Sequence, residues 1–230
     1  MITRAAVVPQ PPLLVPELVP GAVERTASVR DACVAAVKRL PPRWVAVGAT
    51  AQACPIPSSA CGTFRGFGVD VRVALAGDAD GEPVDLPLPA LLAGWLREQA
   101  GAESVEVELL TPSAGPEECA AVGGRLAALD GDVGLLVLGD GSNRHGAAAP
   151  GGDDARAPGF DAEVGAALAA ADAGALLDIA PGLAAELGVQ GRVPWQVLAG
   201  LARAGSWRGE LLYSEAPLGV AYHVAVWERS

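Results

Sequence analysis

Short apolar runs alternate along this chain with longer segments in which apolar residues recur every three or four positions. Compact apolar runs bounded by turn residues are typical of buried strands, and the longer recurrence is typical of helices that pack on one face. The pattern predicts strands at residues 2–8, 44–48, 69–75, 105–110 and 133–139, separated by helices at 22–40, at 87–100 and from Pro116 onward.

Proline and glycine mark the breaks between these segments. The stretch PQPPLLVPELVPG after the first strand cannot be helical, because its prolines lack the amide donor and restrict the residues before them. A Gly- and Ala-rich loop is predicted at 140–157, Ala-rich helical segments at 160–204, and a closing hairpin at 211–228.

Strands separated by helices predict the α/β class, as a single domain over residues 1–230 with a mostly parallel central sheet flanked by helices. The near-continuous apolar run VGLLVLG is the best candidate for a central strand, covered on both faces. Ligands of such sheets gather at the carboxyl ends of the strands. We therefore expect the functional loops to follow Val8, Gly48 and Gly139.

Composition limits the classes of partner. A formal net charge of −11 and no Lys/Arg cluster argue against nucleic acid. No apolar run is long enough to span a membrane, and prolines interrupt the N-terminal apolar stretch, so we expect a cytosolic protein without a signal peptide. The single lysine among many arginines indicates a GC-rich, actinobacterial-type genome. The cysteines form no CxxC pair and are expected to be reduced, buried apolar residues: Cys33, Cys54, Cys61 and Cys119.

Candidate chemistry concentrates in the segment GDGSNRHG after the predicted central strand. His145 is either a pocket acid/base or an exposed loop residue. The amides around Asp140 either cradle an anion or form a tight strand exit. A Ser142–His145 dyad lacks the nucleophile elbow and a third member, and His223 is expected to be structural because it lies in an alternating strand.

Four segments follow one another along the chain in the order PQPPLLVPE, WVAVGATA, LGDGSNRHG and QGRVPWQVLAGL. Together they resemble the LigB superfamily, which comprises the class III extradiol dioxygenase catalytic subunits and the related Memo proteins. The likeness is greatest to actinobacterial members with a PHPPLLVPE-type start, a GDGS loop, a GRxPWQVLAG helix and an ending similar to YGVGYxVAxW. It spans nearly the whole chain and implies the LigB/Memo-like α/β fold.

The resemblance also implies a metal site, which this sequence lacks. The dioxygenases hold Fe(II) with two histidines and a carboxylate, and a further histidine acts as acid/base. Gln10 stands in place of the first histidine and Ala51 in place of the second. Gln190 stands where Memo-like members have a cysteine before Gly-Arg, whereas His145 occupies the acid/base position. The resemblance therefore implies a degenerate site and no bound cofactor.

We expect a descendant of this fold that has lost the metal and binds a small molecule or a protein partner in the former active-site cleft. Arg192 either reaches a carboxylate ligand there or ties two loops together. The alternatives are an active Fe(II)-dependent ring-cleaving oxygenase with substituted ligands, and a non-catalytic scaffold subunit; the oligomeric state stays open. Besides the candidate acid/base His145, the residues expected to mark the cleft are Gln10, Ala51, Asp140, Ser142, Gln190 and Arg192.

Overall fold

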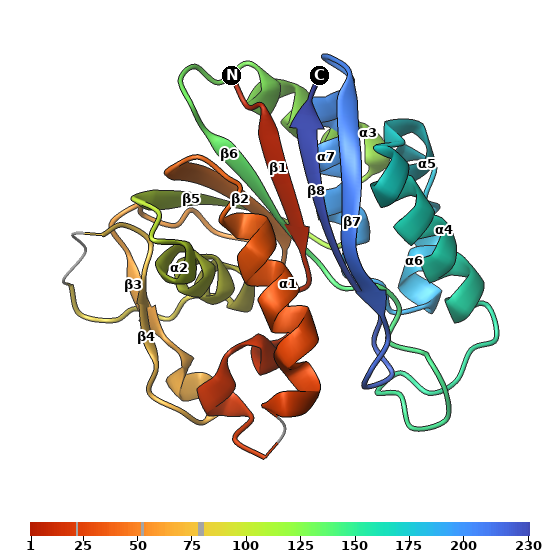
Figure 1. Ribbon diagram of the computed structural model, residues 1–230, viewed down its shortest axis with the longest axis horizontal. Helices are drawn as coiled ribbons and strands as arrows, with labels where there is room; N and C mark the ends of the chain where they lie inside the picture. The colour runs from red at the N-terminus through yellow and green to blue at the C-terminus, as the bar shows by residue number, and fades with distance from the viewer. Residues whose placement is uncertain (22, 52, 78–80) are drawn as a thin grey trace.

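A six-stranded sheet runs through the centre of the molecule in the order β5-β2-β6-β1-β8-β7 (Figure 1). The computed structural model describes residues 1–230 except 22, 52 and 78–80. The first four strands of this order are mutually parallel, whereas β8 is antiparallel to β1, and β7 is antiparallel to β8. The strands are β1 (Arg4–Val8), β2 (Arg43–Ala49), β5 (Ser104–Leu110), β6 (Gly134–Leu138), β7 (Trp207–Glu215) and β8 (Tyr222–Arg229).

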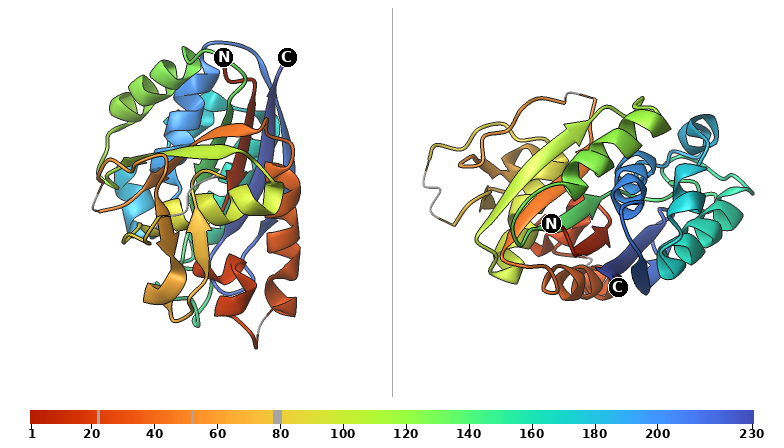
Figure 2. Two further views of the ribbon diagram at one scale, coloured as in Figure 1. Left: turned by 90° about the vertical axis from the view of Figure 1, so that its left-hand side faces the viewer. Right: turned by 90° about the horizontal axis from the view of Figure 1, so that it is seen from above.

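Helices cover both faces of this sheet, as the view from above in Figure 2 shows. One face carries α1 (Ala27–Val37) and α2 (Leu88–Ala100). The other carries α3 (Pro116–Ala127), α4 (Ala157–Ala170), α5 (Ala173–Leu177), α6 (Pro181–Glu186) and α7 (Arg192–Ala202). The chain also forms four short 3-10 helices among its described residues: η1 (Pro12–Leu14), η2 (Pro16–Leu18), η3 (Glu24–Thr26) and η4 (Phe64–Phe67).

Two apolar cores result, one on each face, and the central strands contribute to both. In β1, Ala6 and Val8 pack into the core under α1 and α2, whereas Ala5 and Val7 pack into the core under α3 and α7. Successive side chains of a strand point to opposite faces, so a strand covered on both faces must be apolar throughout. This explains the uninterrupted apolar run in β6, which lies between β2 and β1 as predicted for a central strand.

The α/β class with a mostly parallel sheet flanked by helices is thus confirmed, and most element boundaries lie within a few residues of the prediction. The helix predicted over 22–40 is α1 preceded by η3; its predicted start, Ala22, lies outside the described residues. The predicted segment 160–204 divides into four helices, α4 to α7. Among the described residues, no helix is both long and apolar enough to cross a lipid bilayer.

Two details differ from the prediction. The strand at 69–75 is present as β4 (Arg72–Ala74), but it pairs with β3 (Cys61–Thr63) in a separate two-stranded sheet beside α2. Only Val73 of β4 is buried, so the strand lacks the two apolar faces of the central strands β1 and β6. Cys33, Cys61 and Cys119 are buried as expected, whereas Cys54 is exposed because it lies in the irregular loop after β2.

Candidate functional site

A cavity of about 450 Å³ lies at the carboxyl ends of the parallel strands. Thr50 and Ala51 follow β2, Pro112 follows β5, and Asn143 follows β6; the opposite wall comes from the α6–α7 connection, with Gln190 and Arg192. We call this cavity the cleft. It lies where a mostly parallel sheet places its ligands, and it includes three residues expected from the sequence, namely Ala51, Gln190 and Arg192.

The cleft is framed by the close approach of the α7 N-terminus to the end of β6. The amides of Gln190 and Gly191 donate to the carbonyl oxygen of Asp140, at 3.1 and 2.7 Å. A side chain at Gly139 would overlap the Cα of Gly191, so the strand exit requires a residue without a Cβ. The glycine serves this close packing, because Gly139 is not among the glycines with positive φ.

Gln10 lies behind this wall rather than in it. Its side chain is 3% exposed, and its Nε2 donates to Oε1 of Gln190 at 2.9 Å. Its backbone amide donates to Oδ1 of Asp140 at 2.7 Å. Within the described part of the chain, Oε1 of Gln10 is buried without a hydrogen-bond partner. Gln10 therefore positions Gln190, and through it one side of the cleft.

The donor set at the three matching positions does not fit Fe(II). Gln10 and Gln190 are amides bonded to each other, and Ala51 offers only a methyl group. Ferrous sites of this kind use imidazole and carboxylate ligands. The described residues contain no group of three or more His, Cys, Asp or Glu side chains placed to hold a metal ion.

The Asp140 carboxylate does not line the cleft, although its carbonyl oxygen helps to frame it. Burial raises the pKa of this carboxyl to about 7, against the opposing effect of the hydrogen bond from the Gln10 amide. The pKa of Tyr222 in β8 is raised by burial and further by the charge of Asp140. The Asp140 side chain is partly buried next to the Gln10 amide and, contrary to the prediction, is not among those that line the cleft.

Ser142 is also misplaced by the prediction, because it is fully buried and is not among the residues that line the cleft. Its Oγ donates to the carbonyl oxygen of Leu187 at 2.8 Å, which excludes a dyad with His145. The amides of Gly139, Gly141 and Ser142 all donate to protein oxygens, so this turn does not cradle an anion. Of the two interpretations of the segment, the tight strand exit is correct.

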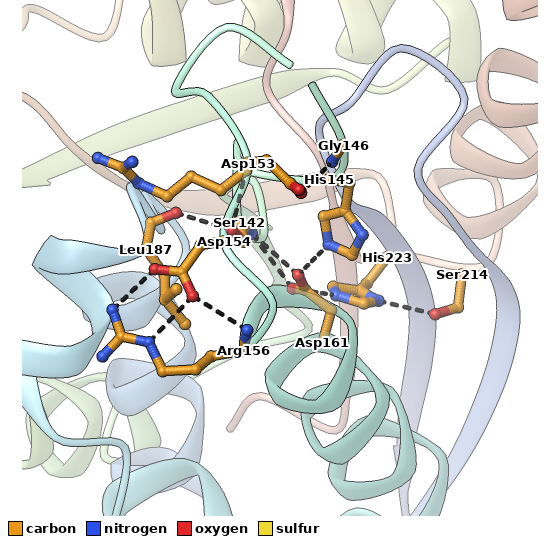
Figure 3. Close-up of polar contacts among 11 residues, drawn as sticks. Ser142, His145, Gly146, Asp153, Asp154, Arg156, Asp161, Leu187, Ser214 and His223 are labelled. Carbon is orange, nitrogen blue, oxygen red and sulfur yellow. Dashed lines mark hydrogen bonds and ion pairs between the residues drawn. The ribbon is translucent and has the colours of Figure 1, made fainter. Parts of the chain in front are cut away.

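Both histidines of the chain meet at one buried carboxylate, that of Asp161 in α4 (Figure 3). Nε2 of His145 lies 2.6 Å from Oδ2 of Asp161, and Nε2 of His223 lies 3.2 Å from Oδ1. The second ring nitrogen of His223 lies 2.9 Å from Oγ of Ser214 in β7. The Ser142 amide also donates to the Asp161 carboxylate, so this group has three partners.

This network joins the 140–157 loop, α4 and the closing hairpin. His145 has the arrangement of an acid/base histidine oriented by a carboxylate, with 16% of its side chain exposed, but it is not among the residues that line the cleft. His223 is 1% exposed and is structural, as expected from its strand. The sequence reasoning missed Asp161, although an acidic residue between apolar neighbours in a helix is a signal of a buried, paired carboxylate.

Comparison with known proteins bears on the fold. No family model matches the chain, and no curated protein matches it. Among solved structures, the chain is similar to the crystal structure of the uncharacterized protein JW3007 from Escherichia coli K12, with a TM-score of 0.59 and 14% sequence identity. The match covers 98% of this chain and 99% of that one. A likeness at this identity supports a common α/β architecture across the whole chain and carries no activity with it.

Proposed function

We propose that this protein binds a small organic molecule in the cleft, without a ferrous ion. The observation that carries the proposal is the cleft itself, about 450 Å³ in volume, at the carboxyl ends of the parallel strands. Cavities of roughly 300–1,000 Å³ that combine apolar walls with a few polar groups are typical ligand sites. The wall combines Ala51 and Val193 with Thr50, Asn143 and Gln190.

The resemblance to the LigB superfamily supports the same location. In that superfamily the loops after the first and second strands and the segment before Gly-Arg surround the substrate. Here Ala51 and Gln190 line the cleft while Gln10 holds Gln190 from behind, and the three positions offer no anionic or imidazole ligand. Because the side chains that would hold the metal are absent while the cavity is present, binding of a small molecule is favoured over metal-dependent ring cleavage.

Calorimetric titration with catechol, the core of the substrates that the resemblance implies, tests this proposal. Ala51→Trp fills the mouth of the cleft from an exposed position and is expected to abolish binding. Ala180→Trp is the matched control, because Ala180 is also exposed but lines a different cavity beside α4. Binding by the native protein that survives Ala180→Trp and is lost in Ala51→Trp supports the cleft.

Anaerobic loading with Fe(II), followed by metal analysis, tests the second half of the proposal. We expect no retained iron, because the three matching positions hold two amides and a methyl group. One iron per chain together with catechol-dependent oxygen uptake would instead establish an oxygenase with substituted ligands. Absence of any catechol binding would favour a scaffold role.

A further inference from the structure

Arg192 brings a buried positive charge to the wall of the cleft. It is the first residue of α7 and is 4% exposed. Its NH1 donates to Oε1 of Gln196 at 2.9 Å, and its NH2 donates to the carbonyl oxygen of Pro112 at 2.7 Å. Both acceptors are uncharged, so these contacts fix the guanidinium without neutralising it.

The other buried arginine of the described residues is bound differently. Arg97 is 7% exposed, and its NH2 lies 3.4 Å from a carboxylate oxygen of Glu98. No carboxylate of the described residues forms an ion pair with Arg192. Burial of an unpaired charge is costly, and such charges in proteins are normally paired. Arg192 therefore lacks the counter-charge that Arg97 has.

The surroundings of Arg192 do not supply that counter-charge. The described residues that line the cleft include no Asp or Glu, although the whole chain carries a net charge of −11. The polar side chains of the wall, those of Thr50, Asn143 and Gln190, are neutral. The N-terminal end of α7, at which Arg192 lies, adds a partial positive charge of the same sign. The cleft is thus locally cationic in an acidic protein.

We propose that the ligand of the cleft is a small organic carboxylate, and that Arg192 binds its carboxylate group; this inference rests on the proposed function. A guanidinium is suited to the planar, two-oxygen carboxylate, and the resulting hydrogen bonds are charge-assisted. The hydrogen bonds from Arg192 to Gln196 and to the Pro112 carbonyl hold the guanidinium at the wall before the ligand arrives. Arg192 is then a specificity-determining residue.

The test compares two probes of nearly equal size, 3,4-dihydroxybenzoate and its neutral amide 3,4-dihydroxybenzamide. The native protein is expected to bind the carboxylate at least about tenfold more tightly. Arg192→Met is expected to reduce this ratio to about one by weakening the carboxylate alone, and Arg192→Lys is expected to retain part of the preference because it keeps the charge. Arg97→Met, which removes the other buried arginine far from the cleft, is expected to leave the ratio unchanged.

A purely structural Arg192 would give a different result, because loss of a tie between α7 and the Pro112 loop affects both probes alike. Equal binding of the two probes by the native protein, or a tenfold preference that survives Arg192→Met, overturns the inference and leaves the proposed function standing. Failure of both probes to bind the native protein overturns the proposed function, and this inference with it. If Arg192→Met does not fold, the native protein and Arg192→Lys decide the question.

Discussion

Asp140 and Arg192 are two ionisable residues near the cleft with different roles. Arg192 lines the cavity, whereas the Asp140 carboxylate accepts the Gln10 amide on the other side of the strand end. Arg192 is proposed to bind the carboxylate of a ligand. Asp140 makes the stability of the fold depend on pH, because burial raises the pKa of its carboxyl to about 7.

Asp140→Asn is expected to remove a pH dependence of stability. Because the pKa of Asp140 is higher in the folded than in the unfolded chain, the folded state binds the additional proton between about pH 4 and pH 7. The free energy of unfolding of the native protein should therefore fall, relative to Asp140→Asn, by on the order of 2 kcal/mol from about pH 5.5 to pH 8. Urea denaturation at several pH values measures this difference, and parallel curves for the two proteins would contradict it.

Part of the site was open to sequence reasoning, and part was not. Ala51 and Gln190, which were expected from the resemblance, and Arg192, which was expected near a helix start marked by Pro194, line the cleft. Ser142 and Asp140 follow the same strand, yet neither lines the cleft, and Ser142 is fully buried. The direction of a side chain just after a strand depends on the local turn. The Asp161 network joins residues 62 positions apart, which no local pattern reports.

The close packing of α7 against α3 is the main feature at the scale of elements, since it helps to hold the helix whose N-terminus forms one wall of the cleft. A Cβ at Gly123 would overlap the backbone of α7 at Val197 and Leu201, and a Cβ at Gly200 would overlap Ala120 of α3. The two helices therefore meet backbone to backbone at these glycines. Neither glycine has a positive φ, so their role is steric.

A pair of neighbouring glycines in α3 gives a direct test of this packing. Gly123→Ala is expected to lower the free energy of unfolding by about 1–3 kcal/mol, because the added methyl group meets backbone atoms that cannot move without shifting a helix. Gly124→Ala is the control: its Cβ would meet open space, so the better helix propensity of alanine should stabilise the protein by up to about 1 kcal/mol. Chemical denaturation of both variants measures the contrast. Equal effects would refute the backbone contact.

The elements themselves were largely predictable, because each depends on short-range pattern. The two-faced apolar strands, Pro116 at the start of α3 and the closing hairpin are local signals. The partner of β4 was not predictable, since a three-residue strand with one buried side chain fits a satellite sheet as well as a central one. Nor did the pattern fix the spatial order of the strands, in which the last two lie beside the first.

At the scale of the whole molecule, this strand order connects the two ends of the chain. β1 lies between β6 and β8, so the first strand has neighbours formed more than 120 residues later. The central sheet is complete only when residues from both ends have come together. Such a sheet is expected to unfold as one cooperative unit, whereas the β3–β4 pair lies beside α2 and meets the main sheet just beyond β4, where the Val105 amide of β5 donates to the carbonyl oxygen of Leu75.

Amide hydrogen exchange followed by NMR is expected to separate these two units. The amides of β1 and β6, whose residues are fully buried apart from Arg4 at the start of β1, should exchange only through global unfolding. The amides of β3 and β4 should exchange at least about tenfold faster, because two strands of three residues form few ladder hydrogen bonds and open locally. β5 is the control, because it lies at the edge of the main sheet but belongs to that sheet. The exchange rates of its amides that bond to β2 should be closer to those of β6 than to those of β4. Equal exchange rates in β4 and β6 would mean that the β3–β4 sheet unfolds together with the core. The segment between β2 and α2, which supplies Ala51 to the cleft, would then open only when the whole molecule unfolds.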